Sequence, residues 1–453
     1  MPDTGPRIFT AHDIRGTVPG DWDGADAYRI GAHFADLTGA PVIALARDNR
    51  EPSTALAQAF ARGVRDRGAE VVDAGLGPAD YLAFVSGTLD VPAAMVTAGH
   101  RPPGYGGIRL FRASAVPVTE GTGLETLRER VAAGGRIGPV ALPGAAREVD
   151  LLLEYAAWLR SLVPGLDELR PLTVVVDAGN GTAGLTAPLV LDHPAVDVVP
   201  LRFELDGRFP HRHPDPLAPH ATDALRERVV AEGADLGLAL GADGGCCVAV
   251  DERGAAVPPP ALYTLLAVRA LDADPGAAVV HDLLVSPTAV AAVEEAGGRT
   301  VRSRVGHPEV RELMAEHKAV FGGDHRGHHC FRDLWGAGSG MLAALHVLAA
   351  VGTERTPLSA LVRLADFPAA SGETEVAGVD PEAALRAVED VHRTPGTAVD
   401  HLDGLTVTRP DGAWFNLRSS RGEPVLRLNA EAATPDAVRA LTRTVLQCVE
   451  SAR

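Results

Sequence analysis

Aromatic residues and cysteines are scarce in this sequence. Phe, Trp and Tyr make up 4% of its 453 residues, and its four cysteines are Cys246, Cys247, Cys330 and Cys448. Neighbouring cysteines cannot easily pair with each other, and no two have the C-x-x-C spacing of common metal sites. We therefore expect reduced thiols and a cytoplasmic location, with Cys246 and Cys247 packing as small apolar residues.

Long apolar runs and net positive charge are also missing. No uninterrupted apolar run reaches the roughly 18 residues that a membrane-spanning helix needs. Residues 1–16, MPDTGPRIFTAHDIRG, are polar where a secretory signal would be apolar. The formal net charge is −17, and negative charge is repelled by nucleic-acid phosphates and anionic lipids. We expect a partner that is neither a nucleic acid nor a membrane.

The patterns that are present predict an α/β protein of several domains. A chain of 453 residues is long enough for about three or four domains of roughly 100–150 residues. Strand-like apolar runs alternate with Ala-, Leu- and Arg-rich helical stretches, in units that begin near residues 41, 172 and 277. Alternating strands followed by one helix near the end predict a small α+β domain. Pro- and Gly-marked joints divide the chain into domains at 1–142, 143–256, 257–368 and 369–453.

Each predicted domain contains one polar loop with at least one glycine. The four loops are TAGHRPPGYGG (97–107), LALGADGGCCVAVDERG (238–254), VFGGDHRGHHCFRDLWGAGSGM (320–341) and LRSSRGEPVLRLNAEA (417–432). In this order they resemble the active-site loops of the α-D-phosphohexomutases, the phosphoglucomutase/phosphomannomutase family. Further segments resemble the same family: AHDIRG (11–16), DAGNGTAG (177–184), DGRFPHRHPDPL (206–217) and SRVGH (303–307).

The resemblance implies both an architecture and a chemistry. It implies three related α/β domains and a small C-terminal α+β domain around a central cleft. In the family, a phosphoserine in the first loop exchanges its phosphoryl group with a sugar phosphate, and three Asp of the second loop hold Mg²⁺. The third loop binds sugar hydroxyls with a carboxylate, and the fourth binds the phosphate that is not transferred.

The loops depart from the family pattern where the chemistry takes place. Gly99 stands at the nucleophile position, which leaves it vacant. Asp243 is the only remnant of the metal loop, because Gly241 and Gly245 replace the other carboxylates, and a single Asp cannot hold Mg²⁺ firmly. Arg109 stands where a basic Lys is usual and cannot give up a proton near neutral pH. We expect no cofactor, and Mg²⁺ would be required only for a conventional mutase.

The other candidate residues line the expected cleft. Arg101, Arg326 and Arg421 stand at positions that are usually neutral, which favours an anionic ligand unless they point to solvent. The fourth loop has Gly422 where Thr is usual. The predicted substrate-binding residues are Arg15, Arg101, Asp324, His325, Arg326, Arg418, Ser419, Ser420, Arg421 and Gly422.

Two histidines stand where the family has site histidines. His100 and His307 could each shuttle a proton, or bind a phosphate or cap a loop, and the sequence does not decide between these roles. The segment HRGHHC (325–330) suggests metal ligands, but its spacing fits no known metal pattern. We assign this segment to the sugar-binding loop.

Three functional hypotheses follow. The first is a divergent member that binds a phosphosugar or related anion without mutase activity, a pseudoenzyme that acts alone, as a homo-oligomer or with an active paralogue. The second is a repurposed, metal-independent enzyme that acts on a phosphosugar through His100, His307 or His325, as in specialised metabolism. The third is a conventional phosphoglucomutase/phosphomannomutase, an isomerase whose missing groups are supplied otherwise.

Overall fold

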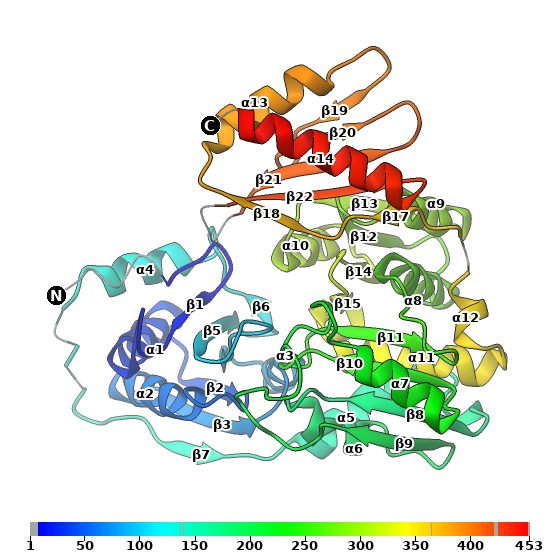
Figure 1. Ribbon diagram of the computed structural model, residues 1–453. Coiled ribbons are helices and arrows are strands. Elements are labelled where there is room, and N and C mark those ends of the chain that lie inside the picture. The colour runs from blue at the N-terminus through cyan, green and yellow to red at the C-terminus, as the bar shows by residue number, and fades with distance from the viewer. Residues whose placement is uncertain (1–7, 136, 139, 364, 421–424, 452–453) are drawn as a thin grey trace.

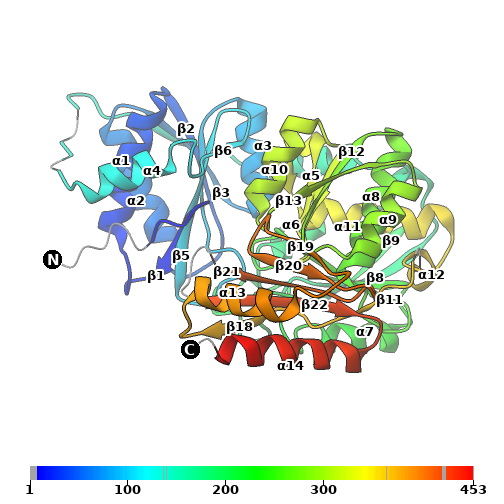
Figure 2. The ribbon, with the colours of Figure 1, turned by 90° about the horizontal axis from the view of Figure 1, so that it is seen from above.

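Four units, each built on its own sheet, make up the structure. It is a computed structural model that describes residues 8–135, 137–138, 140–363, 365–420 and 425–451. The first unit lies at the left in both ribbon views, and the second and third lie at the right (Figure 1, Figure 2). Among the described residues, no helix is long and apolar enough to cross a membrane.

The first domain is a mixed sheet covered by helices. Strand order is β1-β5-β4-β2-β3-β7, with β6 beside β5, and β2 runs parallel to both β3 and β4. Helices α1 and α2 pack closely because Gly63 has no side chain at their contact. A Cβ there would lie 2.1 Å from the Tyr28 carbonyl oxygen. The elements are β1 (Ile14–Thr17), α1 (Gly24–Thr38), β2 (Val42–Arg47), α2 (Ser53–Asp66), β3 (Glu70–Leu76), α3 (Ala79–Leu89), β4 (Ala93–Val96), β5 (Tyr105–Arg112), β6 (Val116–Pro117), α4 (Leu124–Ala132) and β7 (Ala146–Glu148).

The second domain has a four-stranded sheet in the order β11-β10-β8-β9. This domain contains a buried ionic cluster, in which the Asp177 carboxylate pairs with Arg202 at 2.9 Å and with Arg212 at 3.1 Å. The elements are α5 (Leu152–Ser161), η1 (Leu166–Glu168), β8 (Leu172–Asp177), α6 (Ala183–Val190), β9 (Val196–Leu201), α7 (Asp223–Glu232), β10 (Leu236–Leu240) and β11 (Cys247–Asp251). The predicted metal loop, 241–246, connects the antiparallel strands β10 and β11.

The third domain repeats the strand–helix alternation around a sheet in the order β13-β12-β14-β15-β16. The predicted sugar-binding loop connects β14 to β15, which are antiparallel. The elements are α8 (Pro259–Ala273), β12 (Ala278–Asp282), α9 (Pro287–Glu295), β13 (Arg299–Ser303), α10 (His307–His317), β14 (Phe321–Gly323), β15 (His329–Phe331), η2 (Arg332–Leu334), β16 (Ala337–Gly338), α11 (Gly340–Glu354) and α12 (Leu358–Leu361).

The fourth domain is an antiparallel sheet with two helices packed on it. Strand order is β17-β22-β21-β20-β19, with β18 also paired to β22, and α13 and α14 contact each other and the sheet. The elements are β17 (Ala369–Ala370), β18 (Thr374–Ala377), α13 (Pro381–His392), β19 (Ala398–Asp400), β20 (Leu405–Thr408), β21 (Trp414–Ser419), β22 (Val425–Ala432) and α14 (Pro435–Ser451).

The expected fold class is confirmed: three α/β domains precede a sheet-rich fourth domain. The first three domains are joined more tightly than the sequence predicts, because one apolar core runs from Leu82 on α3 through Val174 on β8 to Phe321 on β14. The fourth domain has a separate core, which includes Phe415 and Leu428. The predicted domain boundaries stay predictions.

Candidate functional site

The loop after β4 is pinned by one buried arginine. The Arg50 guanidinium donates hydrogen bonds to the carbonyl oxygens of Gly99 (2.7 Å), Arg101 (2.6 Å) and Pro102 (2.8 Å). Asp48 pairs with Arg50 at 3.2 Å and completes the support. A rigid loop of this kind holds the backbone at position 99 in a fixed place.

Gly99 faces two further arginines. Its φ is +63°, in the left-handed region that favours glycine. A Cβ built there would lie 3.4 Å from Nη2 of Arg109 and 3.4 Å from Nη1 of Arg15. The Arg15 Nε donates to Asp13 Oδ2 at 2.7 Å. The position predicted for the nucleophile therefore faces guanidinium groups, which favour an anion.

The second loop brings one carboxylate to the same place. Asp243 Oδ2 lies 3.7 Å from Nη1 of Arg109, and its Oδ1 accepts a hydrogen bond from the Gly245 amide at 3.2 Å. Burial tends to raise the pKa of Asp243, but the charge of Arg109, the Gly245 amide, His328 and Arg15 outweigh it and lower that pKa. Asp243 is therefore an ionised carboxylate beside an arginine.

This donor set does not fit Mg²⁺. A hard divalent cation takes about six oxygen ligands, usually with more than one carboxylate, and the loop supplies only Asp243, with Gly241 and Gly245 beside it. A guanidinium already faces that carboxylate. In the part of the chain that the structure describes, no three His, Cys, Asp or Glu side chains are placed to hold a metal ion.

The predicted metal loop is instead tied to neighbouring segments by its backbone, and a thiol of the loop itself packs beside Gly241. The Ala79 amide donates to the Asp243 carbonyl oxygen at 2.8 Å, and the Gly340 amide donates to that of Gly244 at 2.9 Å. A Cβ at Gly241 would lie 2.8 Å from Sγ of Cys246. Cys246 and Cys247 are buried and free, and burial raises the pKa of Cys247 to about 12. This agrees with the expectation that both thiols act as packing groups.

The third loop is organised around Asp324. Its carboxylate accepts hydrogen bonds from the amides of Arg326 (2.9 Å) and His328 (3.0 Å) and lies 2.9 Å from Nδ1 of His328. The His328 ring lies 6.1 Å from the rings of both His100 and His307, measured between centroids. The structure thus brings both predicted site histidines to a third one, which the sequence analysis did not select.

These histidines differ in charge. Burial, followed by nearby cationic groups, lowers the pKa of His100 and of His307 well below the usual value. Burial also tends to lower the pKa of His328, but its ion pair with Asp324 outweighs burial and raises that pKa. At neutral pH, His100 and His307 are therefore neutral, and His328 is the group that gains a proton most readily.

His328→Gln should lower thermal stability most at acid pH. The folded pKa of His328 lies above the unfolded value of about 6.5. Its stabilisation is therefore complete below pH 6.5 and is lost as pH rises through the folded pKa. A charge-assisted hydrogen bond of this kind contributes about 1.5–3 kcal/mol. Thermal unfolding of both proteins at several pH values checks this, with His220→Gln, at an exposed ion pair, as control. A wild-type advantage that grows with pH would contradict the assignment.

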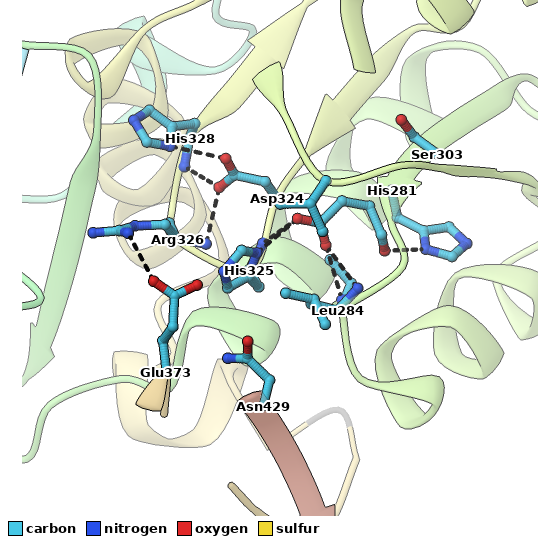
Figure 3. Close-up of polar contacts among 12 residues, drawn as sticks. His281, Leu284, Ser303, Asp324, His325, Arg326, His328, Glu373 and Asn429 are labelled. Atoms are coloured by element: carbon cyan, nitrogen blue, oxygen red, sulfur yellow. Dashed lines mark hydrogen bonds and ion pairs between the residues drawn. The ribbon is translucent and has the colours of Figure 1, made fainter. Parts of the chain in front are cut away.

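His325 points away from this group toward a different partner. Its Nδ1 lies 2.7 Å from Oδ2 of Asp282, and Figure 3 shows His325 near Asp324 and His328. Its Nε2 is buried and has no hydrogen-bond partner among the residues described. An imidazole oriented by a carboxylate, with the other nitrogen free, can accept or deliver a proton.

Arg326 connects three domains. Its Nη2 lies 2.5 Å from Oδ2 of Asp215 in the second domain. Its Nη1 lies 3.6 Å from Oε1 of Glu373 in the fourth domain, a contact that Figure 3 shows. Arg326 therefore contacts carboxylates and does not point to solvent. Neither carboxylate belongs to the four motif loops, so the sequence analysis did not select them.

Glu373 also forms an ion pair with Arg418, the predicted phosphate-binding arginine of the fourth domain. Nη2 of Arg418 lies 2.6 Å from Oε2 of Glu373, and Nη1 donates to Oδ1 of Asn429 at 2.9 Å. Arg427 Nη1 contacts Oε1 of the same glutamate at 3.0 Å. Ser419 ends β21, and the Ser420 amide donates to the Val425 carbonyl oxygen at 2.9 Å. The predicted Arg421 and Gly422 lie outside the described residues.

A cavity of about 640 Å³ lies between the second, third and fourth domains. Its polar wall includes Asp215, His325, Arg326, Glu373 and Asn429, and Leu217, Phe367 and Trp414 contribute apolar surface. Gly99 is not among the residues that line it. The arginine cluster at Gly99 is therefore separate from the residues that line the cavity bounded by Arg326 and Glu373.

Comparisons with known proteins agree with this architecture. The models for phosphoglucomutase/phosphomannomutase alpha/beta/alpha domains I, II and III match residues 6–134, 156–254 and 259–367. The chain is 36% identical over 450 residues to a phosphomannomutase of Salmonella typhimurium, covering 97% of this chain and 98% of that protein. It is 38% identical over 443 residues to the phosphohexose mutases of Xanthomonas campestris, covering 96% and 97%.

A solved structure gives the same result for the whole chain. It is a phosphoglucomutase/phosphomannomutase family protein from Burkholderia thailandensis, with a TM-score of 0.88 and 26% identity. The match covers 100% of this chain and 98% of that one.

Proposed function

Because this chain belongs to the phosphoglucomutase/phosphomannomutase family, we propose that it binds a phosphorylated hexose between its domains. We further propose that it does not carry out the phosphoserine reaction. The phosphate would contact the arginines of the cleft, and the sugar would contact the third loop around Asp324. Arginine suits an anionic ligand because it supplies both positive charge and directional hydrogen-bond donors.

Gly99 is the observation that carries the second part of this proposal. It has no side-chain oxygen, and the surrounding arginines approach the place where a side chain would begin. Thr97 of the same loop does not replace the missing nucleophile. Its hydroxyl is buried and accepts a hydrogen bond from the Gly99 amide at 3.1 Å. Phosphoryl transfer through the enzyme needs a nucleophilic atom in this position, and Gly99 supplies none.

A conventional mutase is the second candidate function. The curated relatives are named phosphomannomutases or phosphohexose mutases, and these names favour an active mutase over a loss of activity. This candidate needs another nucleophile, and a phosphorylated form of the protein would identify it. The Asp282–His325 pair beside the cavity favours a further candidate, metal-independent acid–base chemistry on a bound phosphosugar.

Calorimetry tests the ligand class. Mannose 1-phosphate and glucose 6-phosphate should bind the intact chain, whereas free mannose should not, because the proposed contacts are mainly to phosphate. Absence of heat with both sugar phosphates at millimolar concentration would show that the ligand class is wrong.

Two substitutions in the fourth domain should change affinity in opposite directions. Arg418→Ala removes a phosphate-binding guanidinium and should weaken phosphohexose binding about tenfold or more, as expected for one charge-assisted bond of about 1.5–3 kcal/mol. Glu373→Gln removes the carboxylate that occupies Arg418 and should tighten binding several-fold, because phosphate no longer competes with it.

Calorimetric titration measures both effects. Glu382→Gln makes the same chemical change at an exposed position of α13 and serves as control. If the affinity is unchanged in both Arg418→Ala and Glu373→Gln, Arg418 is not part of the binding site.

A further inference from the structure

Arg109 lies where three separate segments meet. It is on β5 and pairs across the sheet with Met95 on β4. Its Nη1 lies 3.7 Å from Oδ2 of Asp243, and its Nε lies 3.8 Å from Oδ2 of Asp13. On the third side, a Cβ at Gly99 would lie 3.4 Å from its Nη2. One guanidinium thus faces two carboxylates and the vacant nucleophile position.

The guanidinium is held by charge but keeps its donors available. Both of its ion pairs are longer than a hydrogen bond, and it makes no hydrogen bond to any other residue in the described segments. About 29% of its side chain is exposed, so a small anion can reach it. Arg15 is directed to the same point but already donates to Asp13.

Opposite charges form a close cluster around Gly99. The cluster contains the carboxylates of Asp13 and Asp243 and the guanidiniums of Arg15 and Arg109, and their formal charges cancel. A phosphate dianion placed at Gly99 would meet N–H groups of both arginines and would be separated from the carboxylates by the guanidinium of Arg109. The atoms nearest to where a Cβ would stand are guanidinium nitrogens of Arg109 and Arg15, and we call this arginine-bordered position the recess at Gly99.

We infer that Arg109 has taken over the part of the divalent cation, so that the recess at Gly99 binds a phosphate non-covalently and without metal. The inference deepens the proposed function and rests on it: the recess would take the free phosphate group of a hexose bisphosphate or inorganic phosphate. A guanidinium suits this role because it stays charged at all relevant pH values and presents a planar fork of donors to phosphate oxygens.

The surroundings agree with an anion site. Burial is the largest cause that lowers the pKa of His100, and the charges of Arg326 and Arg15 lower it further. Burial also dominates for His307, where Arg311, His328 and Arg109 act in the same direction. Burial therefore keeps both rings neutral, and the arginine charges that act in the same direction would also attract an incoming phosphate.

Inorganic phosphate is the probe for this recess. Binding to the intact chain is followed by calorimetry in the presence of EDTA and again with added Mg²⁺. We expect the same affinity in both conditions. Arg109→Met should weaken phosphate binding at least tenfold, whereas Arg128→Met, at an exposed ion pair on α4, should leave it within about twofold.

A second variant keeps the test decisive if Arg109→Met loses structure. Gly99→Ala leaves every charge in place but puts a methyl group against the two guanidiniums, so it should weaken phosphate binding several-fold. Arg128→Met again serves as the matched control. Circular dichroism and thermal unfolding establish that each variant is folded.

Two results would overturn the inference: phosphate binding that requires Mg²⁺, or binding that persists in folded Arg109→Met and Gly99→Ala. Its failure is distinguishable from that of the proposed function. If sugar phosphates still bind and depend on Arg418 while Arg109→Met has no effect, only the inference fails. If no sugar phosphate binds the intact chain, the proposed function itself fails.

Discussion

Glucose 1-phosphate and mannose 1-phosphate are expected to remain unconverted when the intact chain is supplied with Mg²⁺ and a hexose bisphosphate activator. Enzymes commonly turn over at about 1–10³ per second, and we expect at least a thousandfold less. Gly99 supplies no oxygen to carry the phosphoryl group, and the buried Thr97 hydroxyl is engaged by the Gly99 amide. Tight binding of the substrate cannot compensate for a missing nucleophile, because binding alone does not stabilise the transition state.

A coupled glucose 6-phosphate assay measures this rate, and intact-protein mass spectrometry looks for a phosphorylated form. The phosphomannomutase of Salmonella typhimurium, 36% identical, is the positive control under the same conditions. Turnover at an ordinary rate together with a phosphorylated peptide would contradict the loss of activity and would establish the conventional mutase.

Gly99→Ser alone should not produce detectable mutase activity. A serine there must adopt a φ near +63°, which costs an L-residue roughly 1–2 kcal/mol. Its Cβ would lie 3.4 Å from the nearest guanidinium atoms, and the metal loop retains only Asp243 to hold a cation. Arg109 cannot act as a base, since it does not lose its proton near neutral pH.

Stepwise restoration should recover metal binding before turnover. Adding Gly241→Asp, Gly245→Asp and Cys246→Arg supplies carboxylates, and replacing Cys246 also removes the Sγ atom that lies 2.8 Å from a Cβ at position 241. We expect this quadruple variant to bind Mg²⁺ without turnover. Adding Arg109→Lys, which provides an amine able to exchange protons, should be required before any activity appears.

Mg²⁺ affinity and the coupled assay are followed in parallel on the single, quadruple and quintuple variants. Appreciable turnover by Gly99→Ser alone would mean that the metal loop never limited the reaction. The correspondence of GADGGC, residues 241–246, with the family's carboxylate loop would then have to be abandoned.

Local patterns predicted most of the fold. The apolar runs at 42–47, 172–177 and 278–282 form β2, β8 and β12, because short runs of β-branched and apolar residues between turn signals favour buried strands. The short strands β17, β18 and β19 and the helix α13 were not predicted. The strands have two to four residues each, too few to show a period.

The candidate site was predicted as a set of loops but not as a network of charges. Motif order pointed to Gly99, Arg109 and Asp324, which lie in or beside their loops in sequence. The carboxylates Glu373 and Asp215 were missed because they reach Arg326 from other domains, and no local pattern encodes such a contact. Interdomain ion pairs depend on how the domains pack, which a single sequence does not display.

The measurement that tests the central claim most directly is ³¹P NMR of the intact chain with glucose 1-phosphate, Mg²⁺ and a hexose bisphosphate. It reports binding and chemistry in one sample. We expect the glucose 1-phosphate resonance to broaden or shift on addition of protein, while no 6-phosphate resonance appears over many hours. A growing glucose 6-phosphate resonance, or a substrate resonance that the protein leaves unchanged at millimolar concentration, would contradict this expectation.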